Sequence, residues 1–444
     1  MTYADIILPL PLEGYFTYCV PDTLAPRLQP GCRVRVPLGK TKTYTGLVAA
    51  LHDQVPAGLK TGKEGVKSIV EMMDPGPVLL PQQLRLWQWI ADYYLSPIGD
   101  VYKAALPSGL KAEDDYRPKT ETYVVLADDF RSAQALRAAQ AMLQRAPAQQ
   151  KVLRVYLELA SVSEENPVPQ REITREELMN EAHCTTTVLR QFLDRRILRL
   201  YEKEVGRIPL GGMPHPEHIK PLSEAQADAY NQILVQQMSK DITLLHGVTS
   251  SGKTEIYIHL IQRALDEGRQ VLYLLPEIAL TVQMMQRLRR VFGDRLGIYH
   301  SRYSDAERVE IWKRQLSDHP YDVILGARSA LFLPFQRLGL VIVDEEHEQS
   351  FKQMDPAPRY HARSAAIILA KLCGAKVLLG TATPSSESYW NAQTGKYGYV
   401  RLDKRYQDMA LPAVEVVDVK DLRRRKMMTG HFSPRLLAAI RAAL

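Results

Sequence analysis

The residues with the clearest chemical meaning form a glycine-rich segment, Gly-Val-Thr-Ser-Ser-Gly-Lys-Thr, at 247–254. It follows an apolar run at 242–245 and precedes apolar residues at helical spacing, so it predicts a strand, a glycine loop and a helix. The backbone N–H groups of such a loop, together with the helix N-terminus, form an anion site. Lys253 would contact the β- and γ-phosphates, and the hydroxyl of Thr254 would ligate Mg²⁺. The pattern predicts a nucleoside-triphosphate site made of Gly247, Val248, Thr249, Ser250, Ser251, Gly252, Lys253 and Thr254.

A pair of acidic residues follows a second apolar run, at 338–343. Asp344 ends that run and is typical of a Walker B acid, which would hold the magnesium ion together with Thr254. Glu345 comes directly after it and would orient and activate the attacking water. The spacing therefore predicts catalytic roles for Lys253, Asp344 and Glu345 in one nucleotide-hydrolysing site.

Two further side chains have open interpretations. His347 either couples the nucleotide site to the hydroxyls of Thr381 and Thr383, which would relay a γ-phosphate signal, or is an ordinary loop histidine. Gln226 lies one helix before the glycine loop, where its amide could read the edge of adenine. Because Ser223 stands three residues earlier, a helix-capping box is the alternative for Gln226.

These segments need a scaffold that brings them to one edge. Five apolar runs, at 242–245, 270–275, 322–326, 338–343 and 376–379, alternate with helical patterns. Such alternation is typical of an α/β fold, with a parallel sheet covered by helices on both faces. A polar segment follows each run, at the carboxyl ends of the strands, where such sheets carry their functional residues.

Two smaller units and a linker precede this domain. Residues 1–108 predict a β-rich domain that ends in a helix over 81–94. Residues 109–205 predict short helices followed by a strand, the outline of a winged helix, and contact with DNA or with protein stays open. The proline- and glycine-rich segment at 206–221 predicts a linker. The aromatic residues of the predicted helix either form core or stack on unpaired bases: Trp87, Trp89, Tyr93 and Tyr94.

Composition narrows the class of protein. The 444 residues are 45% hydrophobic and 24% charged, as in ordinary globular proteins. The net charge of +7 arises in residues 206–444, with 32 basic and 25 acidic side chains, which suits a polyanionic partner without proving one. No apolar run approaches the roughly 20 residues of a membrane span, so no membrane partner is expected. The four scattered cysteines predict a reducing compartment and no metal framework: Cys19, Cys32, Cys184 and Cys373.

The order and spelling of the motifs resemble those of superfamily 2 helicases, and in particular the PriA family of bacterial replication-restart helicases. The resemblance rests on Gly-Val-Thr-Ser-Ser-Gly-Lys-Thr-Glu, Leu-Pro-Glu-Ile-Ala-Leu-Thr, Gly-Ala-Arg-Ser-Ala-Leu-Phe, Asp-Glu-Glu-His and Gly-Thr-Ala-Thr-Pro-Ser, in that order. Segments at 15–18, 31–40 and 91–100 are similar to the 3′-end-binding domain of the same family. The resemblance covers nearly the whole chain.

The resemblance implies a RecA-like lobe at 222–409, the start of a second lobe at 410–444, and a winged helix and a 3′-end-binding domain before them. It implies an ATP- and Mg²⁺-dependent 3′→5′ DNA helicase that recognises forked DNA, D-loops, single strands and the leading-strand 3′ end, and that initiates primosome assembly. The implied partners are single-stranded-DNA-binding protein and helicase-loading proteins. The implied location is the bacterial cytoplasm, in association with the nucleoid.

The resemblance also implies DNA-binding residues. One group would line the pocket for the 3′ end, and Thr17 there stands where many members carry aspartate. A second group would form an aromatic-rich loop, in which Phe351 and Tyr360 stack on bases while the loop's cations meet phosphates. The implied positions are Phe16, Gly39, Lys40 and Lys67 in the pocket, Arg328, and Phe351, Lys352, Arg359, Tyr360 and Arg363 in the loop.

The chain departs from the family pattern after Ser385, which only 59 residues follow. A second RecA-like lobe needs about 100 residues or more, so we expect an N-terminal fragment in which 412–444 form the first strand and helix of that lobe. The sequence contains neither the arginine finger nor the cysteine-rich zinc insertion of the family. The resemblance implies Zn²⁺, but the cysteine ligands for that ion are not in this chain. Turnover would then need lobe 2. The alternatives are a fork- and ATP-binding module without turnover, or a RecG-like translocase.

Overall fold

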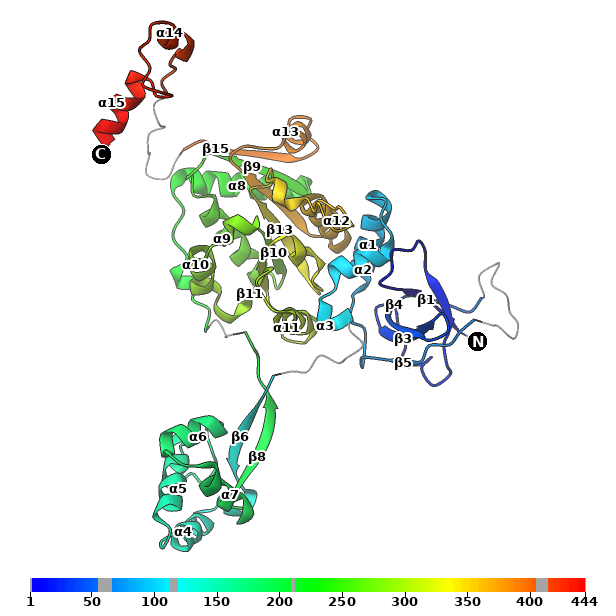
Figure 1. Ribbon diagram of the computed structural model, residues 1–444, viewed down its shortest axis with the longest axis vertical. Helices are drawn as coiled ribbons and strands as arrows, with labels where there is room; N and C mark the ends of the chain where they lie inside the picture. The colour runs from blue at the N-terminus through cyan, green and yellow to red at the C-terminus, as the bar shows by residue number, and fades with distance from the viewer. Residues whose placement is uncertain are drawn as a thin grey trace.

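The computed structural model describes residues 2–54, 66–111, 119–163, 165–208, 212–404 and 414–443. These residues form a five-stranded, a three-stranded and a seven-stranded sheet. Figure 1 shows the seven-stranded sheet and its helices at the centre, with the five-stranded sheet beside them. The three-stranded unit lies apart, at the end of the long strand pair β6 and β8.

The seven-stranded sheet confirms the predicted α/β class, because all its pairings are parallel. Its strands follow the order β11-β12-β10-β13-β14-β9-β15. The five predicted strands are present and almost wholly buried, as expected of strands covered on both faces. The strands are β9 (Ile242–Gly247), β10 (Gln270–Leu274), β11 (Leu296–Tyr299), β12 (Val323–Gly326), β13 (Leu338–Asp344), β14 (Lys376–Thr381) and β15 (Gly398–Leu402). The short strands β11 and β15 were not predicted.

Helices cover both faces of this sheet. On one face, the helices α8 (Glu224–Ser239), α9 (Lys253–Asp266) and α10 (Val282–Phe292) share a single apolar cluster with the strands. The other face carries α11 (Asp305–Leu316), α12 (Ala362–Cys373) and α13 (Ser386–Gln393). We call this unit the P-loop domain.

The N-terminal region adds two helices to that second face. The helices α1 (Pro81–Tyr93) and α2 (Ile98–Ala105) contribute to the same apolar cluster as α11 and α12, and Figure 1 shows α1 beside α12. The indole N–H of Trp312 donates to the carbonyl oxygen of Val78 at 2.8 Å. The amide of Gln82 donates to the carbonyl oxygen of Phe335 at 2.9 Å. Residues 78–105 therefore pack as part of the P-loop domain, and the short α3 (Ser108–Lys111) follows them.

The five-stranded sheet has the order β2-β1-β4-β3-β5. Its strands are β1 (Tyr3–Ile7), β2 (Phe16–Cys19), β3 (Arg33–Leu38), β4 (Lys42–His52) and β5 (Glu71–Met72). The segment before β5 joins its two edges, since Cys19 N–H donates to Lys67 O at 2.8 Å and Val70 N–H donates to Arg35 O at 2.9 Å. These bonds close the sheet around one apolar core.

The three-stranded unit has the winged-helix outline predicted for 109–205. It contains β6 (Thr120–Leu126), α4 (Ala133–Met142), α5 (Pro147–Leu159), β7 (Ile173–Thr174), α6 (Arg175–Ala182), α7 (Thr186–Asp194) and β8 (Leu198–Glu204). The long strands β6 and β8 pair antiparallel over their whole length. Neither β6 nor α4 was predicted.

The C-terminal residues differ from the prediction of a strand and a helix at 412–444. Within 414–443 the structure has two helices, α14 (Val419–Arg424) and α15 (Pro434–Ala443), and no strand. Val414 and Val416, which a sheet would bury, are 87% and 93% exposed. The predicted start of that strand, at 412 and 413, lies outside the described residues. Figure 1 shows both helices apart from the seven-stranded sheet.

Candidate nucleotide site and nucleic-acid interface

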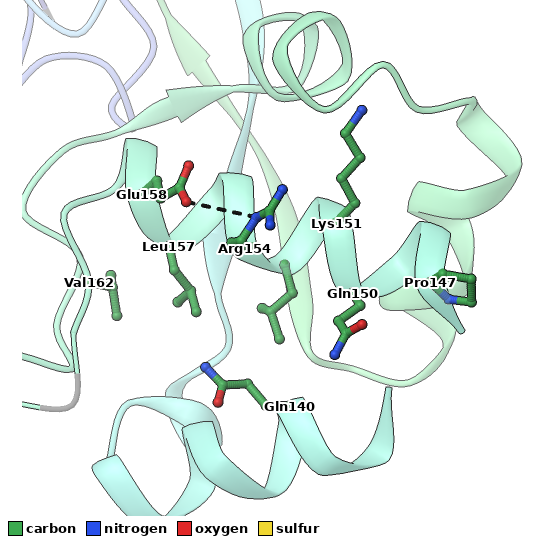
Figure 2. Close-up of a pocket in the computed structure, with 9 residues that line it drawn as sticks. Gln140, Pro147, Gln150, Lys151, Arg154, Leu157, Glu158 and Val162 are labelled. Carbon is green, nitrogen blue, oxygen red and sulfur yellow. Dashed lines mark ion pairs between the residues drawn. The ribbon is translucent and has the colours of Figure 1, made fainter. Parts of the chain in front are cut away.

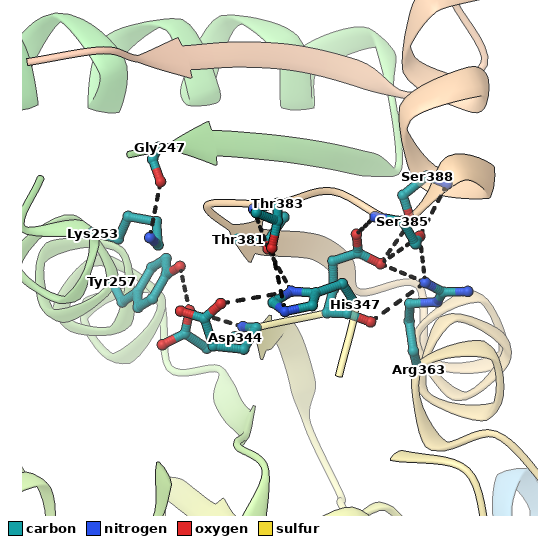
Figure 3. Close-up of polar contacts among 12 residues, drawn as sticks. Gly247, Lys253, Tyr257, Asp344, His347, Arg363, Thr381, Thr383, Ser385 and Ser388 are labelled. Atoms are coloured by element: carbon teal, nitrogen blue, oxygen red, sulfur yellow. Dashed lines mark hydrogen bonds and ion pairs between the residues drawn. The ribbon is translucent and has the colours of Figure 1, made fainter. Parts of the chain in front are cut away.

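The glycine loop joins β9 to α9 with two residues in left-handed backbone. Ser250 has a φ of +61°, and Gly252, directly before the helix, has a φ of +80°. Lys253 is buried, and its ammonium donates to the carbonyl oxygen of Gly247 at 3.0 Å (Figure 3). A Cβ at Gly247 would lie 3.1 Å from the Lys253 side chain, so glycine there leaves room for the lysine. The hydroxyl of Ser251 is buried without a partner, as expected of a donor that an anion would satisfy.

A cavity of about 460 Å³ opens above this loop. It brings together most of the predicted site, because segments from the glycine loop and from the end of β13 meet there. Four lining residues were not predicted, among them Arg287, which forms an ion pair with Glu255. The lining residues are Lys220, Pro221, Gln226, Thr249, Ser250, Ser251, Gly252, Lys253, Thr254, Glu255, Arg287, Asp344 and Glu345. The cavity fits a nucleotide bound through its phosphates.

Two buried tyrosines hold the Walker B acid. The hydroxyl of Tyr257 on α9 donates to Asp344 Oδ1 at 2.9 Å, and that of Tyr273 on β10 donates to Oδ2 at 3.2 Å. Burial, followed by the nearby charge of Glu345, raises the pKa of Asp344 to about 6. Burial and the Asp344 carboxylate raise the pKa of both tyrosines, so their hydroxyls stay protonated donors. Sequence reasoning missed this pair because the contacts span 87 and 71 residues.

Glu345 has an unusual backbone. Its φ of +50° is left-handed, a conformation that costs a side-chain-bearing residue about 1–2 kcal/mol. The turn is held by Glu345 N–H, which donates to Asp344 Oδ1 at 3.1 Å, and by Glu348 N–H, which donates to Glu345 O at 2.9 Å. Strain of this kind concentrates at functional sites, and here the strained residue lines the cavity.

His347 contacts both of its predicted partners. Its Nδ1 lies 2.7 Å from Thr381 Oγ1, and its Nε2 lies 3.3 Å from Thr383 Oγ1. Glu345 Oε2 is 3.7 Å from the same Nδ1 (Figure 3). The histidine therefore joins the ends of β13 and β14, as its linking interpretation requires. A role in relaying the γ-phosphate signal stays a prediction.

The adenine-reading prediction for Gln226 is wrong in this conformation, because both ends of its amide are occupied. The oxygen accepts from Ser223 N–H at 2.9 Å, which completes the capping box offered as the alternative. The nitrogen donates to the carbonyl oxygens of Ser251 and Gly252, at 3.2 and 3.3 Å. Gln226 therefore anchors the glycine loop to α8.

The predicted phosphate contact of Arg363 is also contradicted. Its guanidinium forms an ion pair with Glu346, whose side chain is completely buried, and donates to Ser385 Oγ at 2.6 Å. Glu346 further accepts from Ser385 N–H at 2.8 Å and from the Ser388 hydroxyl at 2.9 Å (Figure 3). With these partners Arg363 joins the Walker B turn to α13 instead of facing solvent.

The two aromatic residues of the loop point inward. Phe351 and Tyr360 are each 1% exposed and belong to the core shared with α1 and α12. Tyr360 packs edge-on against Phe332, with ring centroids 5.2 Å apart. Their burial contradicts the prediction that they stack on bases. The aromatic residue types alone did not reveal which side of the loop they would face.

The cations of the loop remain accessible. Arg359 is exposed, with its Nε donating to Met354 O at 2.9 Å. Lys352 is half-buried, donates to the carbonyl oxygen of Arg359, and lies 5.0 Å from the ring centroid of Tyr94. Arg328, also half-buried, reaches Lys352 O only at 3.4 Å, longer than an ordinary hydrogen bond.

Family models match three consecutive parts of the chain. They are the 3′ DNA-binding domain of PriA at 5–107, a winged-helix domain of PriA helicases described for Bacteroidota at 121–205, and a DEAD/DEAH box helicase at 223–390. Over 95% of its length the chain is 33% identical to the replication restart protein PriA of Haemophilus influenzae, of which it covers 54%. It is 31% identical to PriA of Bacillus subtilis, again over 95% of its length and over 58% of that protein.

The chain belongs to the PriA family. It carries the DNA-binding, winged-helix and helicase domains of that family and spans about half the length of the curated relatives it matches. Among solved structures it resembles the Mycobacterium smegmatis helicase Lhr bound to single-stranded DNA and AMP-PNP, and the Pyrococcus furiosus Hef helicase domain. For Lhr the TM-score is 0.30 and the identity 24%, and the alignment covers 41% of this chain and 26% of Lhr. For Hef the TM-score is 0.31 and the identity 18%, and the alignment covers 44% of this chain and 41% of Hef.

Two of the residues predicted to line a 3′-end pocket lie together. The ammonium of Lys67 donates to the carbonyl oxygen of Gly39, which occupies the β3–β4 turn with a φ of +71°. Lys40 follows it and is exposed. Phe16 lies on β2, half-buried against the core of the closed sheet. A Cβ at Gly39 would have no atom within 4 Å, so Phe16 does not pack on that side of the turn, and the pocket assignment stays a prediction.

Thr17, in the predicted 3′-end pocket, has a carboxylate beside it. Thr17 and Asp5 face each other across β2 and β1, and the Thr17 hydroxyl donates to Asp5 Oδ1 at 2.7 Å. The same carboxylate lies 3.2 Å from His52 Nε2. A negative charge is thus present at this point of the sheet, although it comes from the neighbouring strand.

A larger cavity, of about 650 Å³, lies between α4 and α5 of the winged-helix unit (Figure 2). Its charged lining residues are Lys151, Arg154 and Glu158, and Arg154 pairs with Glu158 on the same helix at 3.8 Å. Both of these side chains are about 70% exposed. Because this ion pair is largely solvated, whereas the cavity at the glycine loop contains the buried Lys253 and Asp344, the smaller cavity is the stronger candidate for a chemical site.

Metal binding at the glycine loop would use hard oxygen donors. The Thr254 hydroxyl and the Asp344 carboxylate line the same cavity, and these are the ligand types that Mg²⁺ prefers. Across the described ranges no group of three or more His, Cys, Asp or Glu side chains is arranged to hold another metal ion. In the same ranges no helix is long and apolar enough to cross a membrane.

Proposed function

We propose that the chain acts in replication restart as the fork-binding part and first motor lobe of an ATP-dependent 3′→5′ DNA helicase. The observation that carries the proposal is the assembled nucleotide site, in which the glycine loop, the Walker B acid and Glu345 line one cavity. His347 connects that cavity to Thr381 and Thr383. Because α1 and α2 share the core of the P-loop domain, the N-terminal DNA-binding unit is built onto the motor lobe.

The residues of the site have separate roles in this proposal. Lys253 would neutralise the β- and γ-phosphates, and Thr254 and Asp344 would hold Mg²⁺, whose charge would offset the negative charge that develops on hydrolysis. Glu345 orients the attacking water from its strained position at the cavity wall. His347 changes partners when the γ-phosphate leaves and passes that change to β14.

The proposed DNA substrate is a fork or D-loop with a leading-strand 3′ end. Phe16 would stack on the terminal base, while Gly39, Lys40 and Lys67 surround the sugar and phosphate. The oxygen of Thr17, whose own proton is donated to Asp5, would accept from the terminal hydroxyl. We further propose that the chain has four functional units, at residues 1–108, 109–205, 222–409 and 410–444, with a linker at 206–221. Arg328 is proposed to contact single-stranded DNA. Single-stranded-DNA-binding protein and helicase-loading proteins are the proposed partners, in the bacterial cytoplasm.

The nucleotide part is tested by binding of a fluorescent ATP analogue in the presence of Mg²⁺. Lys253→Ala should lose this binding while forked-DNA binding persists, since the two sites are separate. Lys220→Ala is the matched control, because Lys220 lines the same cavity but is exposed at its rim. Loss of both activities in Lys253→Ala, with a lowered melting temperature, would show unfolding instead.

The DNA part is tested with forks whose leading-strand 3′ end carries either a hydroxyl or a phosphate. Phe16→Ala should weaken binding to the hydroxyl fork about tenfold, in line with the loss of one stacked base. The phosphate fork should bind weakly to both proteins and respond little to the substitution. Equal weakening for both forks would mean that Phe16 only supports the core and that the 3′-end pocket is misassigned.

A further inference from the structure

Helix α1 displays a stacked pair of aromatic rings on the outer surface of the P-loop domain. Trp89 and Tyr93 lie parallel, with ring centroids 4.8 Å apart and planes 18° apart. Tyr94 stands edge-on to both, at 5.9 and 5.0 Å. Tyr93 is 65% exposed, so much of its ring faces solvent. The stack therefore has one open end.

Tyr93 is the ring that stays outside the core, whereas Trp89 and Tyr94 are half-buried and pack against the cluster shared with α12. Leu86, Trp87 and Ile90 form the buried side of α1 and are completely enclosed. Trp89 and Tyr93 are four residues apart and so lie one above the other along the edge of that buried side. Tyr93 is the last residue of the helix, and its ring is exposed there. Tyr93 is thus an exposed aromatic ring that continues a cluster of rings, and an exposed apolar cluster of this kind points to a binding surface.

Two cations flank the rings. The Lys352 ammonium lies 5.0 Å from the Tyr94 ring centroid, and it also donates to the carbonyl oxygen of Arg359. Arg359 is exposed. Tyr94 accepts from the N–H of His361 at 3.1 Å, which fixes the loop against α1. Open aromatic faces beside cations are the combination with which proteins bind single-stranded nucleic acids.

We propose that the aromatic platform, defined as Trp89, Tyr93, Tyr94, Lys352 and Arg359, binds unpaired bases and the adjoining phosphates of single-stranded DNA. It rests on the proposed function only in taking DNA as the ligand. An unpaired base can extend the Trp89–Tyr93 stack on its open side, whereas the bases of a duplex have no free face. Lys352 and Arg359 stand where the phosphates would follow, and their positive charge favours a nucleic acid over another apolar surface.

The platform also supplies exposed aromatic rings, which the loop after the Walker B acid lacks. That loop provides the cations, but its own rings, Phe351 and Tyr360, are enclosed in the core. The exposed rings come instead from α1, more than 250 residues earlier in the chain, as the Tyr94–His361 contact shows. DNA on the platform would touch the segment that begins just after His347, and so would lie next to the nucleotide site.

The test is binding of a fluorescently labelled oligothymidylate to the whole chain, measured by anisotropy. Tyr93→Ala should weaken binding about tenfold, which is within the range for one stacked base, and Tyr93→Phe should retain it because the ring is kept. Trp390→Ala is the matched control, since this exposed indole lies on α13, away from α1, and its loss should change little. Lys352→Ala should weaken binding and make it less dependent on salt.

The outcomes separate this inference from the proposed function. If the unaltered chain binds the oligonucleotide and Tyr93→Ala binds it equally well, the platform is refuted while DNA binding stands. If the unaltered chain binds no DNA at all, both fail. If Tyr93→Ala changes only self-association in size-exclusion chromatography, the surface joins two copies of the chain and the inference is overturned. Photocrosslinking of an oligonucleotide containing 5-iododeoxyuridine to Trp89, Tyr93 or Tyr94 would support it directly.

Discussion

Tyr257 donates a hydrogen bond to Asp344 across 87 residues of chain, with 2.9 Å between its hydroxyl oxygen and Oδ1. Tyr257 lies one turn into α9, the helix that Lys253 begins. The same helix therefore presents the lysine that we propose binds phosphate and orients the acid that we propose binds magnesium. Gly380 makes this possible, since a Cβ there would lie 1.8 Å from the Tyr257 hydroxyl oxygen.

The first prediction follows from that close approach. Gly380→Ala should lower the free energy of unfolding by about 2–3 kcal/mol, because the core has no room for the added methyl group. In a Tyr257→Phe background the same substitution should cost less, since the nearest remaining ring atom is 2.8 Å away. A double-mutant cycle from urea denaturation measures the difference. Gly76→Ala is the control, with no atom within 4 Å of its Cβ, and equal costs for Gly380→Ala in both backgrounds would refute the steric explanation.

The parts of the site that lie in one short segment could be predicted from the sequence. The glycine loop, Asp344 and Glu345 each follow a buried strand directly, and parallel strands present their carboxyl ends at one edge. The strands β11 and β15 were missed because each has only four or five residues and no motif follows it. Local patterns carry too little information at that length.

Contacts between distant segments could not be predicted. Nothing near Tyr257 or Tyr273 shows that their hydroxyls meet at Asp344. The same holds for Arg363, whose basic type suited a phosphate until the structure placed it against the buried Glu346. Residue type describes what a side chain can do, whereas packing decides which partner it meets.

The second prediction concerns Gln226, whose amide holds the glycine loop. Gln226→Ala should weaken ATP and GTP binding by the same factor, because the lost bonds go to the backbone of Ser251 and Gly252 and not to a base. Titration with fluorescent analogues of both nucleotides gives the two factors. Gln232→Ala, an exposed glutamine on the same helix, should leave both unchanged. A loss confined to ATP would restore the adenine-reading role.

The third prediction separates structural from DNA-binding arginines in the loop. Arg363→Ala should lower the free energy of unfolding by about 3–5 kcal/mol, since it leaves the buried Glu346 carboxylate without its cation. Arg359→Ala, four residues earlier and exposed, should change it by less than about 0.5 kcal/mol. Oligothymidylate binding should fall in Arg359→Ala. Urea denaturation measures the stability of both variants, and fluorescence anisotropy measures their binding to the oligonucleotide. If Arg363→Ala is as stable as the unaltered chain, Arg363 is not a structural residue and its DNA-binding role is open again.

The fourth prediction is a pH dependence that originates at His361. Burial, and then the charges of Arg363 and Lys352, lower the pKa of His361 to about 4, and its Nδ1 is buried without a partner. The folded state thus favours the neutral ring. The contribution of His361 to the free energy of unfolding is therefore complete above about pH 6.5 and is lost as the pH falls towards 4. Allowing for partial solvent screening, the free energy of unfolding lost on acidification should be about 1–2 kcal/mol smaller in His361→Gln than in the unaltered chain. Urea denaturation of both proteins between pH 7 and pH 4.5 measures it, with the exposed His319→Gln as control, and parallel curves for His361→Gln and the unaltered chain would refute the assignment.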